Sequence, residues 1–150
     1  QNVGANKPER AKQSMLTGIA IGLVFGCAVF ALVMLKGDAL AGIFSPDAEV
    51  VQKGFAYLKG FAPETILTAG LFSMIGYFNG NDQTVWVLLQ SLVQTFLVRL
   101  PLAYFTSIRP DASLTMIGLS GPIATAVGIV LNAVFYIHWT RKQRRRAQLG

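Results

Sequence analysis

A chain of 150 residues has the length of one ordinary soluble domain, yet 53% of its residues are hydrophobic and only 13% are charged. That charged share is about half of the share in a typical soluble domain, which argues against a soluble fold. The net charge of +6 does not indicate nucleic-acid binding, because the basic residues flank apolar runs and no nucleic-acid motif accompanies them. We therefore expect an all-α, polytopic membrane helix bundle that has the lipid bilayer, and no nucleic acid, as its partner.

The first predicted transmembrane helix covers residues 15–35 and follows a polar segment, residues 1–14, which we assign to a cytoplasmic loop. Residues 15–35 hold no charge, and at about 1.5 Å per residue they form a helix of roughly 31 Å, which matches a bilayer core. The chain begins with Gln1 and not with methionine, which suggests a piece of a longer protein.

Three glycines of the first helix repeat every four residues: Gly18, Gly22 and Gly26. Small residues at this spacing let helix backbones approach closely in lipid, so we interpret them as helix-packing residues. Cys27 lies in the middle of the same apolar run, and we interpret it as a small buried packing residue.

The second predicted element covers residues 46–78 and combines an outer helical lead-in with a transmembrane helix. Pro46 stands at the first helical position of the lead-in, between a capping serine and an acidic residue, a pattern typical of a helix start. The membrane part is expected over residues 61–78. Pro63 either kinks the long helix or opens this part of it.

Glu64, near the start of that membrane part, is the candidate ion-coupling residue. An ionisable side chain inside a membrane is costly and usually faces a cavity or a partner, so it is a functional candidate by default. There it could exchange a proton or bind sodium. The competing interpretation is that Glu64 lies shallow, near the outer interface, and is simply solvated.

The third predicted transmembrane helix covers residues 84–105 and carries polar side chains over roughly half of its circumference, since successive residues turn by about 100°. The candidates for lining a cavity are Gln90, Ser91, Gln94 and Thr95. Such a face either lines a wet cavity or hydrogen-bonds to neighbouring helices. Arg99 belongs to the same face, and we interpret it as a side chain that snorkels to the headgroups.

The fourth predicted transmembrane helix covers residues 117–139, and a basic cytoplasmic tail, residues 140–150, follows it. Small residues again repeat every four positions on this helix and predict close packing against other helices. They are Ser120, Ala124 and Gly128.

Ser120 and His138 also raise the possibility of an intramembrane protease, with the serine as nucleophile and the histidine as its base. Both lie on the same predicted helix, 18 positions apart, which is about 27 Å. A base must lie within hydrogen-bond distance of its nucleophile. We therefore expect no enzyme activity from this pair.

Lysine and arginine counts predict how the helices are oriented. Three of these residues precede the first helix and five follow the fourth, whereas four lie in the segments between helices on the opposite side. Four spans place both ends on one side of the membrane. We therefore predict a multi-pass protein of the cell (inner) membrane with both ends cytoplasmic.

Five motifs occur in an order that resembles one transporter family. They are Gln1-Asn2-Val3-Gly4-Ala5, Phe44-Ser45-Pro46-Asp47, Gly76-Tyr77-Phe78-Asn79-Gly80-Asn81, Phe96-Leu97-Val98-Arg99-Leu100-Pro101 and Gly118-Leu119-Ser120-Gly121-Pro122. Each motif is weak alone, but the ordered set covers nearly the whole chain. The chain resembles the C-terminal part of the MATE (multidrug and toxic compound extrusion) transporters.

The resemblance implies that the four helices are the last four of twelve and form part of a C-terminal lobe, with the N-terminal lobe as a missing partner. Family members exchange sodium or protons for organic cations by alternating access, and the resemblance implies no other cofactor and no metal site. Some bacterial branches couple through an acidic residue in the tenth helix, the span that holds Glu64. Others place the carboxylate in the first helix, which this chain lacks.

Three other functions stay open at the level of sequence. A flippase of the same superfamily would move lipid-linked oligosaccharide, and a broad cationic groove on the inner side would favour that function. A self-contained four-helix exporter would resemble the small multidrug resistance proteins, but those carry a glutamate in the first span, where this chain has no acid. A non-transporting assembly or sensor module is the third.

Overall fold

The computed structural model describes residues 1–149, with the backbone alone for residues 144 and 146–149. Over this part the chain forms helices and turns and no strand, which confirms the all-α prediction. The elements are α1 (Pro8–Gly42), α2 (Ala48–Phe61), α3 (Glu64–Gly80), α4 (Thr84–Leu92), the π-helix η1 (Val93–Arg99), α5 (Leu100–Ser107), α6 (Leu114–Gly118) and α7 (Ser120–Leu149).

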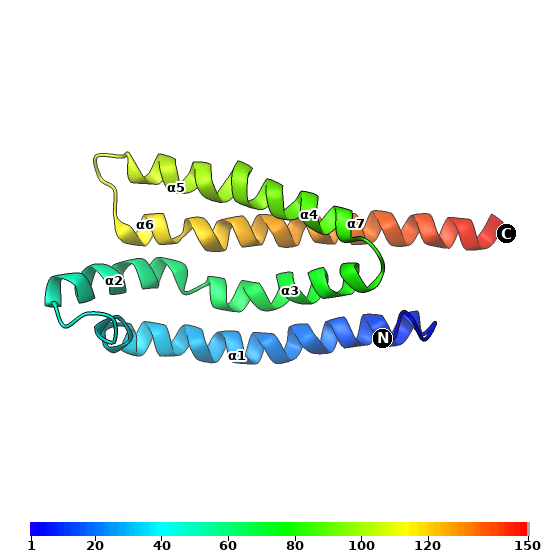
Figure 1. The fold of residues 1–150 in the computed structure, drawn as a ribbon, viewed down its shortest axis with the longest axis horizontal. Coiled ribbons are helices and arrows are strands. Elements are labelled where there is room, and N and C mark those ends of the chain that lie inside the picture. The colour runs from blue at the N-terminus through cyan, green and yellow to red at the C-terminus, as the bar shows by residue number, and fades with distance from the viewer. Residues whose placement is uncertain (150) are drawn as a thin grey trace.

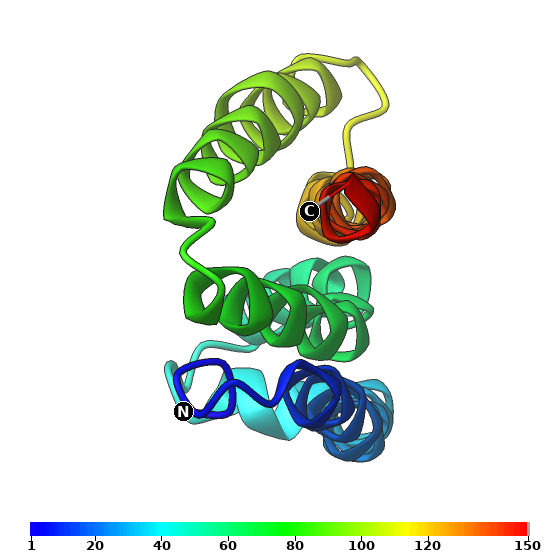
Figure 2. The ribbon, with the colours of Figure 1, turned by 90° about the vertical axis from the view of Figure 1, so that its right-hand side faces the viewer.

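These elements group into long rods that run side by side in the spatial order α1, α2 with α3, α6 with α7, and α4 to α5 (Figure 1). Viewed along the rods, α3 lies between α1 and α7 (Figure 2). The packing follows the same order, since α3 contacts both α1 and α7, and η1 contacts α7. The buried side chains accordingly concentrate on α3 and α7, as Leu71, Phe78, Ala124, Thr125 and Asn132 illustrate.

Three helices of the described part are long and apolar enough to cross a membrane: Pro8–Gly42, Thr84–Ser107 and Leu114–Gln143. The four predicted spans include these three. The remaining one, residues 46–78, is divided between α2 with 14 residues and α3 with 17. Helix α3 alone is only about 25 Å long, shorter than a bilayer core of about 30 Å.

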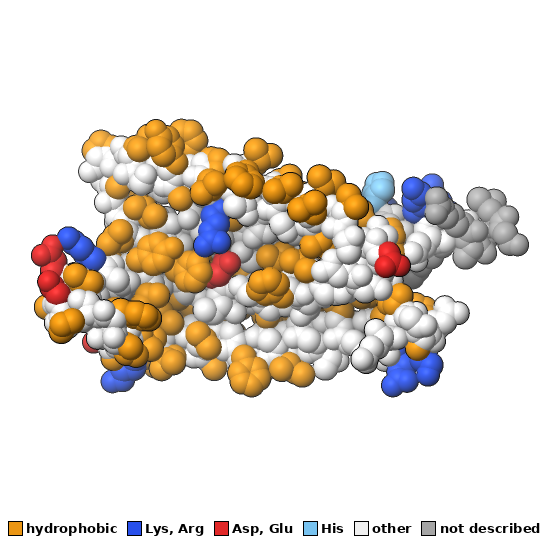
Figure 3. Space-filling view, viewed as in Figure 1, with side chains coloured by type: hydrophobic (Ala, Val, Ile, Leu, Met, Phe, Trp, Pro, Cys, Tyr) orange, Lys and Arg blue, Asp and Glu red, His pale blue; other side chains and the backbone are white. Residues whose placement is uncertain are grey.

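The surface between the ends of the rods is largely apolar. Val24, Leu35 and Leu97 are each more than 70% exposed, and many other large apolar side chains are open as well. Figure 3 shows hydrophobic side chains over the length of one face, with charged groups gathered at both ends and one basic and one acidic side chain near its middle. This distribution suits lipid better than water.

Helix α1 packs on α3 through its glycines. A Cβ on Gly22 would lie 2.6 Å from Ala69 Cβ, and one on Gly26 would overlap the Thr65 carbonyl. Thr65 Oγ1 donates to the Gly26 carbonyl oxygen over 3.0 Å at this contact. Gly18 faces Ser73 in the same row.

The prediction that Cys27 is buried is wrong, because its side chain is exposed. It lies next to Gly26, and successive residues of a helix point about 100° apart. Since Gly26 is buried against α3, its neighbour turns away from the core.

The third span contains a wide turn that the sequence analysis did not predict. Residues Val93–Arg99 form the π-helix η1, and the Leu100 N–H donates to the Thr95 carbonyl five residues earlier. Pro101 follows directly, and a proline has no N–H and clashes with the carbonyl four residues before it. A wider turn ahead of the proline relieves this conflict while the rod continues as α5.

Candidate functional site

The candidate site begins at a break in the second predicted span. Helix α2 ends at Phe61, and Pro63 occupies the N-cap position of α3 with helical backbone angles. Pro63 therefore opens a new helix, and Glu64 is the first residue of α3. A carboxylate at this position is favourable because the helix dipole places partial positive charge at a helix N-terminus.

A chain of hydrogen bonds connects Glu64 to two other helices. Thr125 Oγ1 of α7 donates to Glu64 Oε1 over 2.8 Å. Gln94 Nε2 of η1 donates to Thr125 Oγ1 over 3.2 Å, and Gln90 Nε2 of α4 donates to Gln94 Oε1 over 2.6 Å. Every donor in this hydrogen-bond chain, Gln90–Gln94–Thr125–Glu64, points toward the carboxylate, and an ionised carboxylate is an acceptor only. The hydrogen-bond chain thus ends at Glu64 Oε1.

Gly128 makes this arrangement possible. A Cβ at Gly128 would lie 2.5 Å from Gln94 Oε1 and 2.7 Å from Gln90 Nε2, so any side chain there would displace both amides. The small residue expected to pack helices therefore makes room for the polar groups of α4 and η1.

The depth of the site follows from three apolar helices. Gly26, which accepts from Thr65 beside Glu64, lies one residue from the middle of residues 15–35. Gln94 lies next to the middle of Thr84–Ser107. Thr125 lies about 5 Å along the helix from the middle of Leu114–Gln143. All three neighbours place Glu64 halfway along the rods.

Two polar atoms near the hydrogen-bond chain have no partner. Glu64 Oε2 and Gln90 Oε1 are buried without a hydrogen bond, and the Gln90 side chain as a whole is 1% exposed. A buried polar atom without a partner costs free energy, so a native site normally supplies one, such as a proton, an ion or water. Glu64 Oε2 is the free acceptor at the end of the hydrogen-bond chain.

The comparison with known proteins matches the sequence of the chain to one family. The family model described as MatE matches residues 1–105. The chain belongs to the MatE family. The resemblance drawn from the motifs is thereby confirmed, and with the apolar helices it indicates an integral membrane protein.

One curated relative of this MatE chain is the multidrug resistance protein MdtK of Photorhabdus laumondii subsp. laumondii. The two are 26% identical over 147 residues, which are 95% of this chain and 32% of MdtK. The chain thus spans about a third of the length of that relative. No solved structure matches the chain significantly.

The predicted cavity-lining residues of the MatE chain lie on different faces. Gln90 and Gln94 point toward α7, as the hydrogen-bond chain shows. The Ser91 hydroxyl donates to the Val87 carbonyl of its own helix, and Thr95 is exposed. Arg99 is exposed too. The polar half of this helix is therefore split between an interhelical network and the outer surface.

The small residues of α7 face inward. Ser120 is 6% exposed and Ala124 is fully buried. The Ser120 hydroxyl donates to the Ile117 carbonyl, whereas His138 is exposed near the other end of the helix. The structure does not bring these two side chains together.

Thr125 is the site residue that the sequence analysis did not single out. It is 1% exposed and is bonded to both Glu64 and Gln94. Its neighbour Ala124 belongs to the small-residue row, so a hydroxyl directly beside that row was the available signal. Trp86 and Asn132 extend the same interface, since Trp86 Nε1 donates to Asn132 Oδ1 over 2.9 Å.

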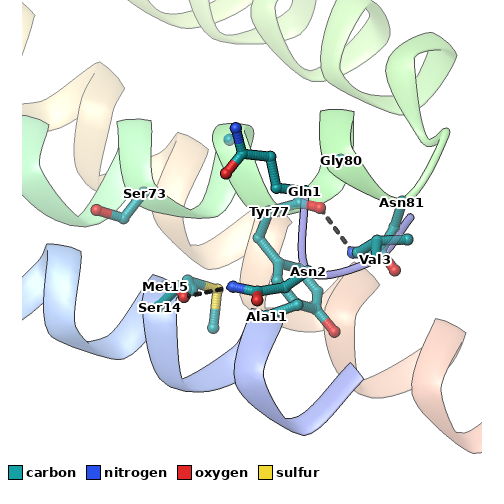
Figure 4. Close-up of a pocket in the computed structure, with 11 residues that line it drawn as sticks. Gln1, Asn2, Val3, Ala11, Ser14, Met15, Ser73, Tyr77, Gly80 and Asn81 are labelled. Carbon is teal, nitrogen blue, oxygen red and sulfur yellow. Dashed lines mark hydrogen bonds between the residues drawn. The ribbon is translucent and has the colours of Figure 1, made fainter. Parts of the chain in front are cut away.

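A separate cavity of about 260 Å³ lies at the end of the bundle that carries the N-terminus, between the first residues and the second half of α3 (Figure 4). Asn2, Tyr77 and Asn81 line it, and Asn2 Nδ2 donates to Ser14 Oγ over 3.0 Å. It lies beside Ser73 to Asn81, whereas Glu64 begins the opposite end of α3.

Proposed function

We propose that this chain forms part of the C-terminal lobe of a cation-coupled antiporter that exports organic cations or drugs by alternating access. Family membership and the similarity to a multidrug resistance protein support export as the activity. The observation that carries the proposal is the position of Glu64, halfway along the rods and at a helix break. Discontinuous helices near the midplane are the usual places for coupling-ion sites in secondary transporters.

The residues of the site suit a proton or a sodium ion. Glu64 Oε2 is a free carboxylate oxygen and takes a proton without further ligands. A sodium ion is a hard cation that would need additional oxygen ligands, from Gln90 Oε1 or from helices outside this chain. The hydrogen-bond chain holds Glu64 Oε1 and leaves Oε2 for the exchange.

Competition at one carboxylate explains how coupling would proceed. A carboxylate that is neutralised by the driving ion loses its attraction for a cationic substrate. Release of that ion restores the attraction. Each state then favours a different arrangement of the two lobes, which shifts their equilibrium by differential affinity. This account needs no enzyme chemistry.

The proposal is tested by measuring transport by the full-length natural protein that contains these residues. The purified protein is reconstituted in liposomes, and uptake of a fluorescent organic cation such as ethidium is measured with an opposed proton gradient, an opposed sodium gradient, or neither. Uptake that requires one of the gradients supports antiport and identifies the ion. Uptake that is the same under all three conditions would contradict cation coupling.

A further inference from the structure

An apolar groove opens at the far end of α7, away from Glu64. It has a volume of about 440 Å³, and its apolar walls come from α4 and α7. Trp86, Leu131, Val134 and Phe135 form these walls, and we call them the aromatic groove. Val134 is 58% exposed, so the groove is open to the outside of the described chain.

The walls of the aromatic groove are fixed by their own contacts. The rings of Trp86 and Phe135 stack with centroids 4.2 Å apart and planes 6° from parallel. Phe135 also packs edge-on against Phe78, which is fully buried. The Trp86 indole N–H donates to Asn132 Oδ1. The groove is therefore preformed and does not depend on an occupant for its shape.

Basic side chains stand at one end of the groove. His138 and Lys142 belong to its lining, and they also line a neighbouring cavity of about 280 Å³ together with Arg141 and Arg145. These four residues, here the basic rim, lie three or four positions apart or adjacent on one helix, so they share a side of α7. An apolar slot thus continues directly into a cationic one.

The charges around the basic rim leave it available to an anion. The ion pair found in the described part of the chain joins Lys53 to Glu49 on α2, so none of the arginines and lysines of the rim is paired there. The neighbouring turn contributes Gln83 to the groove and carries Asp82, an exposed acid. Glu9 of α1 lies in a further cavity that includes Arg141.

We propose that the aromatic groove and the basic rim bind an anionic phospholipid, with an acyl chain along the groove and the headgroup phosphate at Lys142 and the adjoining arginines. Basic pockets at the cytoplasmic ends of transmembrane helices recognise anionic headgroups by charge. Trp139, which also lines the groove, is typical of the membrane interface where a headgroup would lie. The proposal does not rest on the coupling role of Glu64.

This binding is tested by measuring how brominated lipids quench tryptophan fluorescence of the full-length natural protein that contains these residues. The protein is reconstituted in phosphatidylcholine liposomes that contain increasing fractions of phosphatidylglycerol with brominated acyl chains. The signal of Trp139 is obtained as the difference between this protein and its Trp139→Phe variant. Brominated phosphatidylglycerol should quench it at a lower mole fraction than brominated phosphatidylcholine does. Lys142→Ala should raise the half-quenching fraction by about fivefold, the effect of removing one charge near an anionic surface.

Matched variants test whether the charge of Lys142 is what binds the lipid headgroup. Lys142→Arg keeps the charge, so its fluorescence should be quenched as in the unchanged protein. Lys53→Ala removes an exposed lysine of α2 and should also leave the quenching unchanged. Equal quenching by the two brominated lipids would overturn headgroup selectivity. No quenching by either lipid would mean that another helix of the natural chain covers the groove, which also overturns the proposal.

Discussion

The hydroxyl of Thr125 donates a 2.8 Å hydrogen bond to Glu64 Oε1, joining two helices through residues that are 61 positions apart in the chain. The same hydroxyl accepts from Gln94 over 3.2 Å. One side chain thus holds the carboxylate of α3, the π-helix η1 and α7 together. A change in the charge of Glu64 would therefore act directly on side chains of three rods.

Replacing Glu64 by glutamine tests the coupling role. The amide oxygen still accepts from Thr125, so we expect the protein to insert and fold, but it no longer exchanges a proton or binds a cation by charge. Gradient-driven export of an organic cation should be lost when Glu64→Gln is introduced into the full-length natural protein. The measurement is ethidium efflux from cells together with an immunoblot of their membranes.

The matched control for that variant is Glu49→Gln, which changes an exposed acid of α2 that pairs with Lys53. Export should stay normal, because exposed ion pairs contribute little to stability. Normal export by Glu64→Gln itself would end the coupling role.

Replacing Thr125 by valine tests the hydrogen-bond chain. The valine has a similar size but leaves Glu64 Oε1 and Gln94 Nε2 without their partner, a loss that costs about 1–3 kcal/mol for a buried group. We expect export to fall by about tenfold or more, since about 1.4 kcal/mol corresponds to a factor of ten. The dependence of export on the pH or sodium concentration should shift as well.

Thr125→Ser keeps the hydroxyl and should restore most of the export and the original ion dependence. This comparison distinguishes a positioning role from simple packing, because serine loses the methyl group that valine retains. A serine variant as impaired as the valine variant would point to packing.

The apolar patterns predicted the rods but could not predict their internal breaks. Residues 15–35 lie inside α1, whose backbone departs from helical angles at Lys36, just after the predicted end. A run of apolar residues without charge reports the length of a span directly. Pro63, by contrast, is compatible in sequence with a kink or with a new helix. The structure shows a new helix, because α2 ends before Pro63 and α3 begins after it.

The partners of Glu64 were harder to predict than Glu64 itself. An acid in an apolar segment is conspicuous in any sequence, whereas the hydroxyl of Thr125 resembles many others. Its role depends on which helices are neighbours and on their register, including the extra residue of η1. Gln90 and Gln94 were recognised as polar residues of one face, but their direction toward α7 follows from tertiary packing at Gly128.

Two glycine substitutions, one at the contact between α1 and α3 and one away from it, should have different effects on stability. Gly26→Ala places a Cβ into the Thr65 backbone, which is unable to move without shifting α3, so we expect destabilisation of about 1–3 kcal/mol. Gly76→Ala meets nothing within 4 Å and should be neutral or stabilising by at most about 1 kcal/mol. Thermal unfolding of the purified protein in detergent compares the two. Equal melting temperatures would mean that the rods are not in contact at Gly26.

The orientation of the chain is testable by cysteine labelling. Both ends are predicted to be cytoplasmic from the distribution of basic residues, so the turn between α5 and α6 should face outward. Ala112 is exposed in that turn, and Gln143 is exposed near the C-terminal end of α7. The two positions are exchanged one at a time for cysteine in a cysteine-free version of the longest natural chain, in which Cys27 is alanine.

Intact cells treated with a membrane-impermeable maleimide should label Ala112→Cys and leave Gln143→Cys unlabelled until the cells are opened. The reverse pattern would place the basic tail outside and would contradict the charge-based orientation. Labelling of both positions in intact cells would mean that the two positions lie on the same side of the membrane, so that the rod between them does not span it. The helix α6–α7 lies between these two sites, so the experiment also tests whether Leu114–Gln143 forms a complete span.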